Sequence, residues 1–361
     1  MIATSYPRND ADWQGLFIRR LAAAMGREPS LTASLWAPEG PLDEGVSYSC
    51  TSEDAEFLRG MAERGGIAYL LKSTPFRGLL MAIKLLLRLR KLYRRAAPET
   101  DIFHINWLQN ALPLYRMNVK AVIAVLGTDF QLLKIPGVVF LIRRVLATNQ
   151  CILAPNSDWM VEELRRKFGD LAEVRPVNFG IENIWYEIPA SPPKPVNEWL
   201  CVLRLTPAKV GRLFAWGETI FGEEHVLNLV GPNQAGVDIP EWANYLGPLS
   251  PEELSRDWYP RSTGFVTLSE HDEGKPQVLL ETMAAGLPVI ASNIPAHAEV
   301  VQEGFNGYLV ASKEAFASAI ENMSNPEHRS EMSLNCRNSS KALYGTWADC
   351  LNRYLELYRV L

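Results

Sequence analysis

Short apolar runs alternate with amphipathic stretches along almost the whole chain. A short apolar run predicts a buried strand, whereas apolar residues repeated every three or four positions predict a helix. Residues 16–25, 158–168 and 277–285 have the helical pattern. Regular alternation of strands and helices favours parallel sheets covered by helices on both faces, which is an α/β fold. The expected strands are residues 2–4, 102–105, 121–125, 151–154, 200–203, 226–230, 264–268 and 289–292.

One segment interrupts this alternation. Residues 189–197 read PASPPKPVN, and four prolines in nine residues exclude regular structure and make a stiff connector. We therefore expect a hinge there between two α/β domains, one at residues 1–188 and one at residues 198–345. The last stretch, residues 346–361, carries regularly spaced aromatic and leucine side chains and is expected to form a helix.

The composition is that of a globular protein and excludes several functional classes. The 361 residues are 47% hydrophobic and 21% charged, and the net charge of −5 gives no indication of nucleic-acid binding. The five cysteines stand singly, without the spacing of metal ligands or of a disulfide framework, so a reduced, cytoplasmic protein is expected. The N-terminus lacks the apolar region of a signal peptide, and no apolar run has the length of a membrane span.

The segment from Ser269 to Ser292 reads SEHDEGKPQVLLETMAAGLPVIAS. A polar loop with Glu273 follows an expected strand, and a helix of good helix formers begins after Pro276. Glu281 lies eight residues after Glu273, about two helical turns along. Loops at the carboxyl ends of parallel strands face the ligand crevice, and a helix N-terminus favours phosphate. Two carboxylates that bind hydroxyls, flanking a phosphate site, predict a site for a nucleotide sugar.

This segment resembles the E-x7-E region of retaining GT-B glycosyltransferases, and of glycosyltransferase family 4 in particular. The following stretches AAGLPVIAS and GFNGYLV strengthen the resemblance, which extends over most of the chain. It implies a GT-B fold, in which two Rossmann-like domains face a central cleft and the C-terminal helix crosses back onto the N-terminal, acceptor-binding domain. It also implies that Glu273 contacts the donor sugar and Glu281 the nucleotide ribose.

The resemblance assigns further residues to the nucleotide-sugar donor. Arg204 and Lys209 match an arginine and a lysine, five apart, that clamp the donor diphosphate, although Val210 replaces a glycine that normally follows the lysine. Cations suit that place because the leaving diphosphate gains negative charge as the glycosidic bond breaks. Gly15 matches a turn glycine after the first strand. The other expected donor-binding residues surround the start of the helix after Glu273: Gly274, Lys275, Gln277 and Val278.

Asp129 is the second residue, beside Glu273, to which the resemblance gives a catalytic role. It ends the sequence VLGTD, where the family often has a histidine, then a glycine, and an aspartate two residues further on. Leu126 stands in place of that histidine, which helps to orient the donor sugar, so the departure bears on sugar identity or activity. His104, near the end of the preceding expected strand, is interpreted as a hydrogen-bonded structural histidine.

The implied reaction transfers a glycosyl group, of the hexosyl type, from a nucleoside diphosphate sugar to a glycan or glycolipid with retention of configuration. The resemblance implies front-face attack assisted by the leaving phosphate. No cofactor or metal is implied, because the cationic clamp and the helix N-terminus take the place of a metal. Asp10 and Asp12 form a D-x-D pattern that binds a metal in a different glycosyltransferase fold, but they lie far from the donor motifs and we interpret the pattern as coincidence.

Residues 76–95 read FRGLLMAIKLLLRLRKLYRR, with seven basic residues and no acidic one. Lys84, Arg88, Lys91 and Arg95 recur at helical spacing, and the apolar residues do not form one clean face. A basic amphipathic helix favours the headgroup region of an anionic membrane. We expect contact with such a surface at the inner face of the plasma membrane. The alternatives are an acceptor-phosphate site and an ordinary helix with a solvated basic face.

Two other functions remain compatible with the sequence. A sugar-nucleotide epimerase shares the GT-B architecture, but no acid/base set for it stands out. A catalytically silent binding or scaffold protein is favoured by Leu126, and it is opposed by charged residues of the donor motifs that a scaffold does not need. Those four residues are Arg204, Lys209, Glu273 and Glu281. Slow hydrolysis of the donor would distinguish an enzyme from a scaffold.

Overall fold

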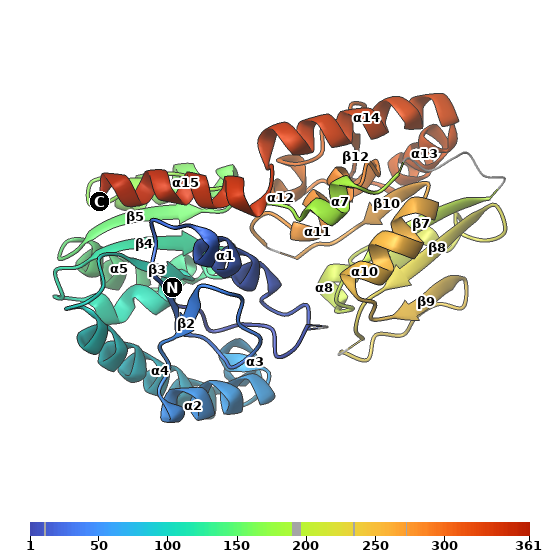
Figure 1. Cartoon of the computed structure of the whole chain (residues 1–361). Helices are drawn as coiled ribbons and strands as arrows, with labels where there is room; N and C mark the ends of the chain where they lie inside the picture. The colour runs from blue at the N-terminus through green and yellow to red at the C-terminus, as the bar shows by residue number, and fades with distance from the viewer. Residues whose placement is uncertain (11, 190–195, 234, 272) are drawn as a thin grey trace. The chain divides into compact units, whose positions relative to one another are not determined.

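The computed structural model describes residues 1–10, 12–189, 196–233, 235–271 and 273–361, which fold into two compact units (Figure 1). The first unit contains Met1–Asn178 and Trp347–Leu361, and the second contains Phe179–Thr346. Most of the expected hinge, residues 190–195, lies outside the described residues. Residues 179–188 belong to the second unit, in which Ile181 forms a bridge with Thr346.

The second unit is built on a six-stranded sheet in the order β12-β11-β10-β7-β8-β9, with every adjacent pair parallel. From β7 the chain proceeds outward through β8 and β9 on one side, and then returns to add β10, β11 and β12 on the other. The strand order therefore reverses between β7 and β10. The strands are β7 (Asn197–Val202), β8 (His225–Val230), β9 (Ala243–Gly247), β10 (Gly264–Thr267), β11 (Val289–Ser292) and β12 (Gly307–Val310).

Helices lie in most of the connections between these parallel strands, whereas the described residues between β8 and β9 contain none. Short helices follow the first strands of the unit, whereas long helices close its C-terminal part. The α-helices of this unit are α7 (Asn183–Tyr186), α8 (Pro207–Val210), α9 (Leu213–Gly217), α10 (Pro251–Glu253), α11 (Gln277–Ala284), α12 (Pro295–Ala298), α13 (Lys313–Ser324) and α14 (Pro326–Leu343).

The first unit contains a parallel four-stranded sheet, β3-β4-β5-β6, and a parallel pair, β1-β2. The expected first strand appears only as isolated bridges: Ile2 pairs with Trp36 after β1 and with Ile105 in β3, and so joins the two sets of strands. The strands are β1 (Ala33–Leu35), β2 (Val46–Tyr48), β3 (Phe103–Asn106), β4 (Lys120–Val125), β5 (Gln150–Pro155) and β6 (Glu173–Val174).

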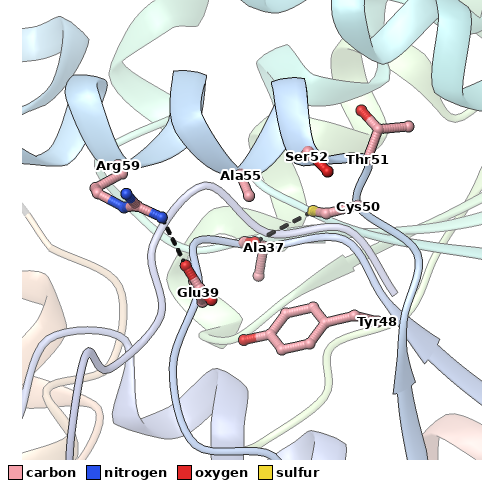
Figure 2. Close-up of a pocket in the computed structure, with 8 residues that line it drawn as sticks. All are labelled: Ala37, Glu39, Tyr48, Cys50, Thr51, Ser52, Ala55 and Arg59. Atoms are coloured by element: carbon pink, nitrogen blue, oxygen red, sulfur yellow. Dashed lines mark hydrogen bonds and ion pairs between the residues drawn. The ribbon is translucent and has the colours of Figure 1, made fainter.

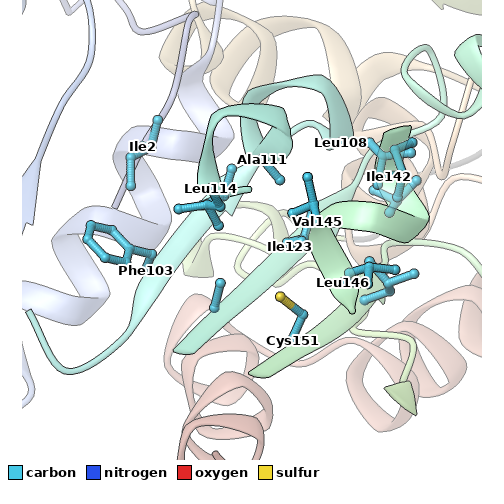
Figure 3. Close-up of a cluster of buried hydrophobic side chains, with 14 of the residues drawn as sticks. Ile2, Phe103, Leu108, Ala111, Leu114, Ile123, Ile142, Val145, Leu146 and Cys151 are labelled. Atoms are coloured by element: carbon cyan, nitrogen blue, oxygen red, sulfur yellow. The ribbon is translucent and has the colours of Figure 1, made fainter. Parts of the chain in front are cut away.

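An apolar core fills the space between this sheet and its helices (Figure 3). Alternate residues of β4, such as Ile123, and residues of α5, such as Val145, contribute fully buried side chains. The α-helices of this unit are α1 (Leu16–Arg27), α2 (Ser52–Glu63), α3 (Gly66–Ser73), α4 (Pro75–Ala96), α5 (Val138–Leu146), α6 (Val161–Phe168) and α15 (Trp347–Val360).

The C-terminal helix α15 returns to the first unit and packs against α1 (Figure 1). His104, in β3, anchors it: Nδ1 lies 2.7 Å from the Tyr358 hydroxyl, and the ring meets Tyr354 edge-on at a centroid distance of 4.6 Å. The imidazole is 3% exposed, and burial lowers the pKa of His104 to about 3, helped by the N-terminal ammonium. The ring is therefore neutral and structural at neutral pH.

We expect His104 to make the first unit acid-sensitive. A histidine in the unfolded chain has a pKa of about 6.5, so between that pH and about 3 the unfolded state binds more protons than the folded state. The stability that neutral His104 contributes is complete above pH 6.5 and falls as the pH drops below it. Relative to His104→Gln, the wild type should lose about 2 kcal/mol of unfolding free energy between pH 6.5 and about 5, measured in urea. Equal losses in both proteins would contradict this assignment.

Candidate functional site

Two loops leave adjacent strands at the point where the strand order of the second unit reverses. β7 and β10 pair directly, with Trp199 opposite Gly264. In open α/β sheets, ligands bind outside the carboxyl ends of the strands at such a reversal. The segment after β7 carries Arg204 in a loop and Lys209 in the short helix α8, and the loop after β10 leads into α11 and carries Glu273. The topology thus brings together residues that are distant in sequence.

The first of these loops is fixed by local hydrogen bonds and by a glycine. The Thr206 hydroxyl accepts a hydrogen bond from the backbone N–H of Lys209 at 3.3 Å and caps α8, whose first residue is Pro207. Gly211 ends α8 with φ +53°, and a Cβ built there would lie 1.9 Å from the carbonyl oxygen of Leu268. Only glycine allows the two loops to approach this closely.

Three further contacts join the two loops. The backbone N–H of Glu270 donates to the carbonyl of Ala208 at 2.8 Å, and the Arg212 side chain pairs with the Glu270 carboxylate at 2.8 Å. Lys209 Nζ lies 2.8 Å from Glu273 Oε2. The predicted phosphate-binding cation and the predicted sugar-binding carboxylate are therefore in direct contact.

The Lys209–Glu273 pair is partly buried, and this strengthens the attraction between its two charges. The two side chains are 21% and 18% exposed, so water screens them less than it screens a surface ion pair. An ammonium can donate three hydrogen bonds, so Lys209 can hold Glu273 and an anionic oxygen at the same time. Arg204, on the same loop, is half-buried. This part of the unit is suited to bind an anion next to a group that accepts hydrogen bonds from hydroxyls.

His297 belongs to the same region, and the sequence patterns did not reveal it. The ring is 1% exposed, and Nδ1 lies 3.0 Å from the carbonyl oxygen and 3.1 Å from the hydroxyl of Ser292. Burial lowers the pKa of His297, the Ser292 carbonyl and the Glu273 carboxylate raise it, and Lys209 lowers it. His297 is in α12, directly after the carboxyl end of β11, so the position of ligand sites in α/β sheets was the signal that could have identified it.

Glu281 lies on α11, which follows the Glu273 loop. Glu281 is half-buried, and its negative charge affects the Tyr259 hydroxyl. Burial raises the pKa of Tyr259, and the Glu281 carboxylate raises that pKa further. The structure thus places Glu273 before the helix and Glu281 in its second turn, on one continuous segment after β10.

The other predicted donor-binding residues at the start of α11 differ in their surroundings. Gly274 is buried and Val278 is half-buried. The side-chain amide of Gln277 donates to the carbonyl of Gly180 at 2.9 Å. That bond connects α11 to the segment with which the second unit begins.

Lys275 has partners within the fold. Its Nζ lies 2.6 Å from Glu299 Oε1 and 5.1 Å from the centre of the Tyr344 ring, and its side chain is 3% exposed. A buried ammonium needs such partners, because an unpaired charge in the interior is costly. Lys275 thus connects the ends of α12 and α14, and its role in donor binding stays a prediction.

Gly15 precedes α1 in the first unit. It has φ +77°, and a Cβ there would lie 2.7 Å from the backbone nitrogen of Tyr6. The loop after Ile2 therefore folds back onto the start of α1, which requires glycine at this position.

Asp129 is buried in the first unit and is bound by backbone groups. Its carboxylate oxygens accept hydrogen bonds from the backbone N–H groups of Leu108 and Leu126, both at 2.8 Å, and the residue is 2% exposed. Burial raises the pKa of Asp129 to about 6, against the lowering effect of these N–H donors. A carboxylate bound in this way organises the loops after β3 and β4, and its catalytic role stays a prediction.

A pocket of about 350 Å³ lies at the carboxyl edge of β1 and β2 in the first unit (Figure 2). The ion pair between Glu39 and Arg59, at 2.8 Å, lies at one end of the lining and Thr51 at the other. Tyr48 contributes a ring and a hydroxyl that accepts a hydrogen bond from the Gly40 N–H. Charged groups, hydroxyls and an aromatic ring around a small pocket suit a hydroxyl-rich ligand.

The basic segment forms the 22-residue helix α4. Lys84 and Lys91 are exposed. Arg88 pairs with the buried Asp54 at 3.0 Å, and Arg95 donates to the Ser49 carbonyl at 2.9 Å, so these two cations also hold the fold together. Among the described residues, no helix combines the length and the apolar character that a membrane crossing needs. No three of the described His, Cys, Asp and Glu side chains are grouped as metal ligands.

Part of the second unit matches a known family. Residues 238–341 match the family described as "Glycosyl transferases group 1", and this range includes Glu273 and Glu281. The chain also resembles "Spore coat protein SA" of Bacillus subtilis (strain 168), with 29% identity over 147 residues. That match covers 39% of this chain, and it spans 38% of the length of the relative. The second unit therefore carries a glycosyl transferases group 1 domain.

Solved structures resemble the whole chain. Sucrose-phosphate synthase from Thermosynechococcus elongatus aligns with a TM-score of 0.73 at 16% identity, over 99% of this chain and 97% of the other. Anabaena Alr3699/HepE in complex with UDP-glucose aligns with a TM-score of 0.68 at 12% identity, over 100% and 98%. A glycosyltransferase from Rickettsia africae ESF-5 aligns with a TM-score of 0.65 at 13% identity, over 96% and 94%. These matches and the two parallel-sheet units confirm the predicted GT-B fold.

Proposed function

We propose that this chain, whose residues 238–341 form a glycosyl transferases group 1 domain, is a glycosyltransferase of family 4 type. It transfers a hexosyl group from a nucleoside diphosphate sugar to a glycan or glycolipid with retention of configuration, without a metal. The second unit binds the donor and the first binds the acceptor. The reaction belongs to the synthesis of a surface polysaccharide or glycolipid at the cytoplasmic face of the plasma membrane.

The 2.8 Å contact between Lys209 and Glu273 carries this proposal. In a nucleoside diphosphate sugar, the sugar is bonded directly to the second phosphate. A site for it needs a cation for that phosphate and, within a few ångströms, a carboxylate for the sugar hydroxyls. The pair supplies both at the reversal of the strand order. Glu281, in the second turn of the helix that follows Glu273, binds the ribose in this proposal.

Each group has a defined role in the proposed reaction. Lys209 and Arg204 neutralise the negative charge that grows on the leaving diphosphate as the bond from the sugar to the phosphate breaks. Glu273 orients the sugar and is itself held by Lys209. The leaving phosphate oxygen accepts the proton of the acceptor hydroxyl on the same face of the sugar, which gives retention without a protein nucleophile.

A uridine nucleotide is the first donor to test, because the similar structure of Anabaena Alr3699/HepE holds UDP-glucose. The pocket at β1 and β2 supports acceptor binding in the first unit, because its hydroxyls and its Glu39–Arg59 pair match the hydrogen-bonding groups of a saccharide.

We expect UDP to raise the melting temperature of the wild type without added metal, and Glu281→Ala to lose most of this shift. A ligand at about 100 times its Kd stabilises the native state by about 2.7 kcal/mol, which corresponds to roughly 5–10 °C for a unit of this size. Thermal unfolding of both proteins in EDTA measures the effect. Glu321→Ala is the matched control, because Glu321 is an exposed glutamate on α13 in the same unit.

The same experiment separates the remaining alternatives. Stabilisation by UDP together with slow release of UDP from UDP-glucose supports a transferase, whereas stabilisation without turnover favours a silent binding protein. Conversion of the nucleotide sugar into an epimer, without an acceptor, indicates an epimerase. If no nucleotide shifts the wild type at millimolar concentration, the proposed donor site is wrong.

A further inference from the structure

Helix α4 has two apolar faces. Leu85, Leu89 and Leu92 point into the core of the first unit and are at most 4% exposed. A second row faces outward at spacings of four, three and four residues, which places its members on one side of the helix. The exposed fractions of this row are 73% for Phe76, 43% for Leu80, 46% for Ile83 and 61% for Leu87. The apolar pattern of this segment therefore serves two surfaces, which is why it shows no single clean face in the sequence.

We call this outer row the apolar stripe, and Leu79, on the same helix and 53% exposed, widens it. Helix α3 packs against the opposite side of the start of α4, since a Cβ on the buried Gly78 would lie 2.6 Å from the backbone nitrogen of Leu71. Single exposed apolar residues are ordinary, but a continuous row on one surface indicates an interaction site.

Cations border the apolar stripe. Lys84 and Lys91 are exposed and lie between the stripe and the inward face of the helix, and Arg77 and Arg94 are exposed near its ends. No acidic residue occurs on α4. Arg88 does not contribute a free charge, because it is bound to Asp54. The exposed face of α4 therefore combines a row of apolar side chains with positively charged side chains next to it.

We propose that the apolar stripe of α4 docks on an anionic membrane surface. The helix lies parallel to the surface, with Phe76, Ile83 and Leu87 below the headgroups and the lysines at the level of the lipid phosphates. Charge decides between a membrane and a second copy of this chain, because pairing two such faces would bring their positive borders together. The inference rests on the proposed function in one respect: a glycolipid acceptor would lie at the lipid surface on which α4 docks.

Sedimentation with vesicles tests this inference. Wild-type protein should bind vesicles of phosphatidylcholine in which about a third of the lipid is phosphatidylglycerol, and should bind pure phosphatidylcholine far more weakly. Each lysine near an anionic surface contributes about fivefold in binding, so Lys84→Gln/Lys91→Gln should weaken the partition roughly 25-fold. Ile83→Ser/Leu87→Ser should weaken it roughly tenfold, because two half-exposed apolar side chains no longer enter the bilayer.

Matched controls distinguish docking through α4 from non-specific hydrophobic binding to vesicles. Leu334 and Leu343 are 62% and 52% exposed on α14 in the second unit, so Leu334→Ser/Leu343→Ser should bind vesicles like the wild type. The wild type has ten tryptophans. In Leu80→Trp, the emission that exceeds that of the wild type should shift to shorter wavelength on anionic vesicles, which reports entry of the stripe into the bilayer. Circular dichroism confirms that each variant is folded.

Three results would overturn the inference: no binding of the wild type to anionic vesicles, equal binding of Ile83→Ser/Leu87→Ser, or a wild-type dimer in sedimentation that this variant dissociates. The UDP-induced melting shift is measured on the same samples. A normal shift without vesicle binding removes only the membrane inference, and vesicle binding without a shift removes only the proposed donor site.

Discussion

A Lys209→Met variant should transfer sugar about 100- to 1,000-fold less efficiently in kcat/KM, because one charged donor to the leaving diphosphate is lost. The diphosphate gains charge as the bond to the sugar breaks, so an interaction with it is stronger in the transition state than in the bound substrate. Lys209 is well placed to make this interaction, since α8 and the Thr206 cap fix its backbone and Glu273 fixes its ammonium at 2.8 Å. Steady-state kinetics with the donor identified by thermal shift measure the effect.

A double variant distinguishes this role from a purely structural one. If Lys209 served only to neutralise Glu273, then Lys209→Met/Glu273→Gln would recover most of the activity, because no unpaired carboxylate would remain. If Lys209 acts on the phosphate, the double variant stays at least as inactive as Lys209→Met. Arg212→Met is the matched control: its pair with Glu270 joins the same loops at 2.8 Å, but its side chain is 62% exposed, and kcat/KM should change by less than about threefold.

Gly211→Ala should unfold the second unit at a melting temperature roughly 6–12 °C below that of the wild type. A methyl group at this position would lie 1.9 Å from the carbonyl oxygen of Leu268, and the backbone has φ +53°, which L side chains rarely adopt. The loops must move apart or the strand must shift, at an expected cost of about 3 kcal/mol in unfolding free energy. Calorimetry measures this loss.

The same substitution should impair the site below its melting temperature. Moving Gly211 away from Leu268 separates the loop of Lys209 from the loop of Glu273, so the UDP-induced shift should shrink as well. Gly222→Ala is the control, because a Cβ at Gly222 meets nothing within 4 Å, and stability should change by less than about 0.5 kcal/mol. A melting temperature of Gly211→Ala equal to that of the wild type would show that the close approach of the loops is not required.

Local patterns were sufficient for most strands of the two larger sheets and for some of the helices. The strand at residues 289–292 and the helix beginning at residue 277 occur where the sequence predicts them, because a short apolar run and a set of good helix formers between Pro276 and Gly286 need no distant partner. The short strands β1, β2 and β6 were not expected, since two or three residues leave too little pattern to recognise. They are held by pairing with neighbouring strands.

Side-chain roles depended on distant partners. Lys209 and Lys275 are both lysines in a predicted donor motif, yet one is half-buried against Glu273 and the other is buried against Glu299 and Tyr344. The motif of Asp129 gave no indication that its carboxylate would be bound to backbone N–H groups of two loops. A motif specifies the residue type, while the partners of a charge are set by which loops the sheet brings together.

The order of residues was enough to establish the α/β class, the succession of the main strands and helices and the segments that carry the charged motifs, because these follow from local periodicity and turn residues. Packing of the folded chain was needed to bring β7 and β10 side by side, to let Lys209 meet Glu273 from 64 positions away, and to place His297 near them. It also selected which of the two apolar faces of α4 is buried. Burial and pairing are properties of the packed chain, and the periodicity of one helix is the same whichever face turns inward.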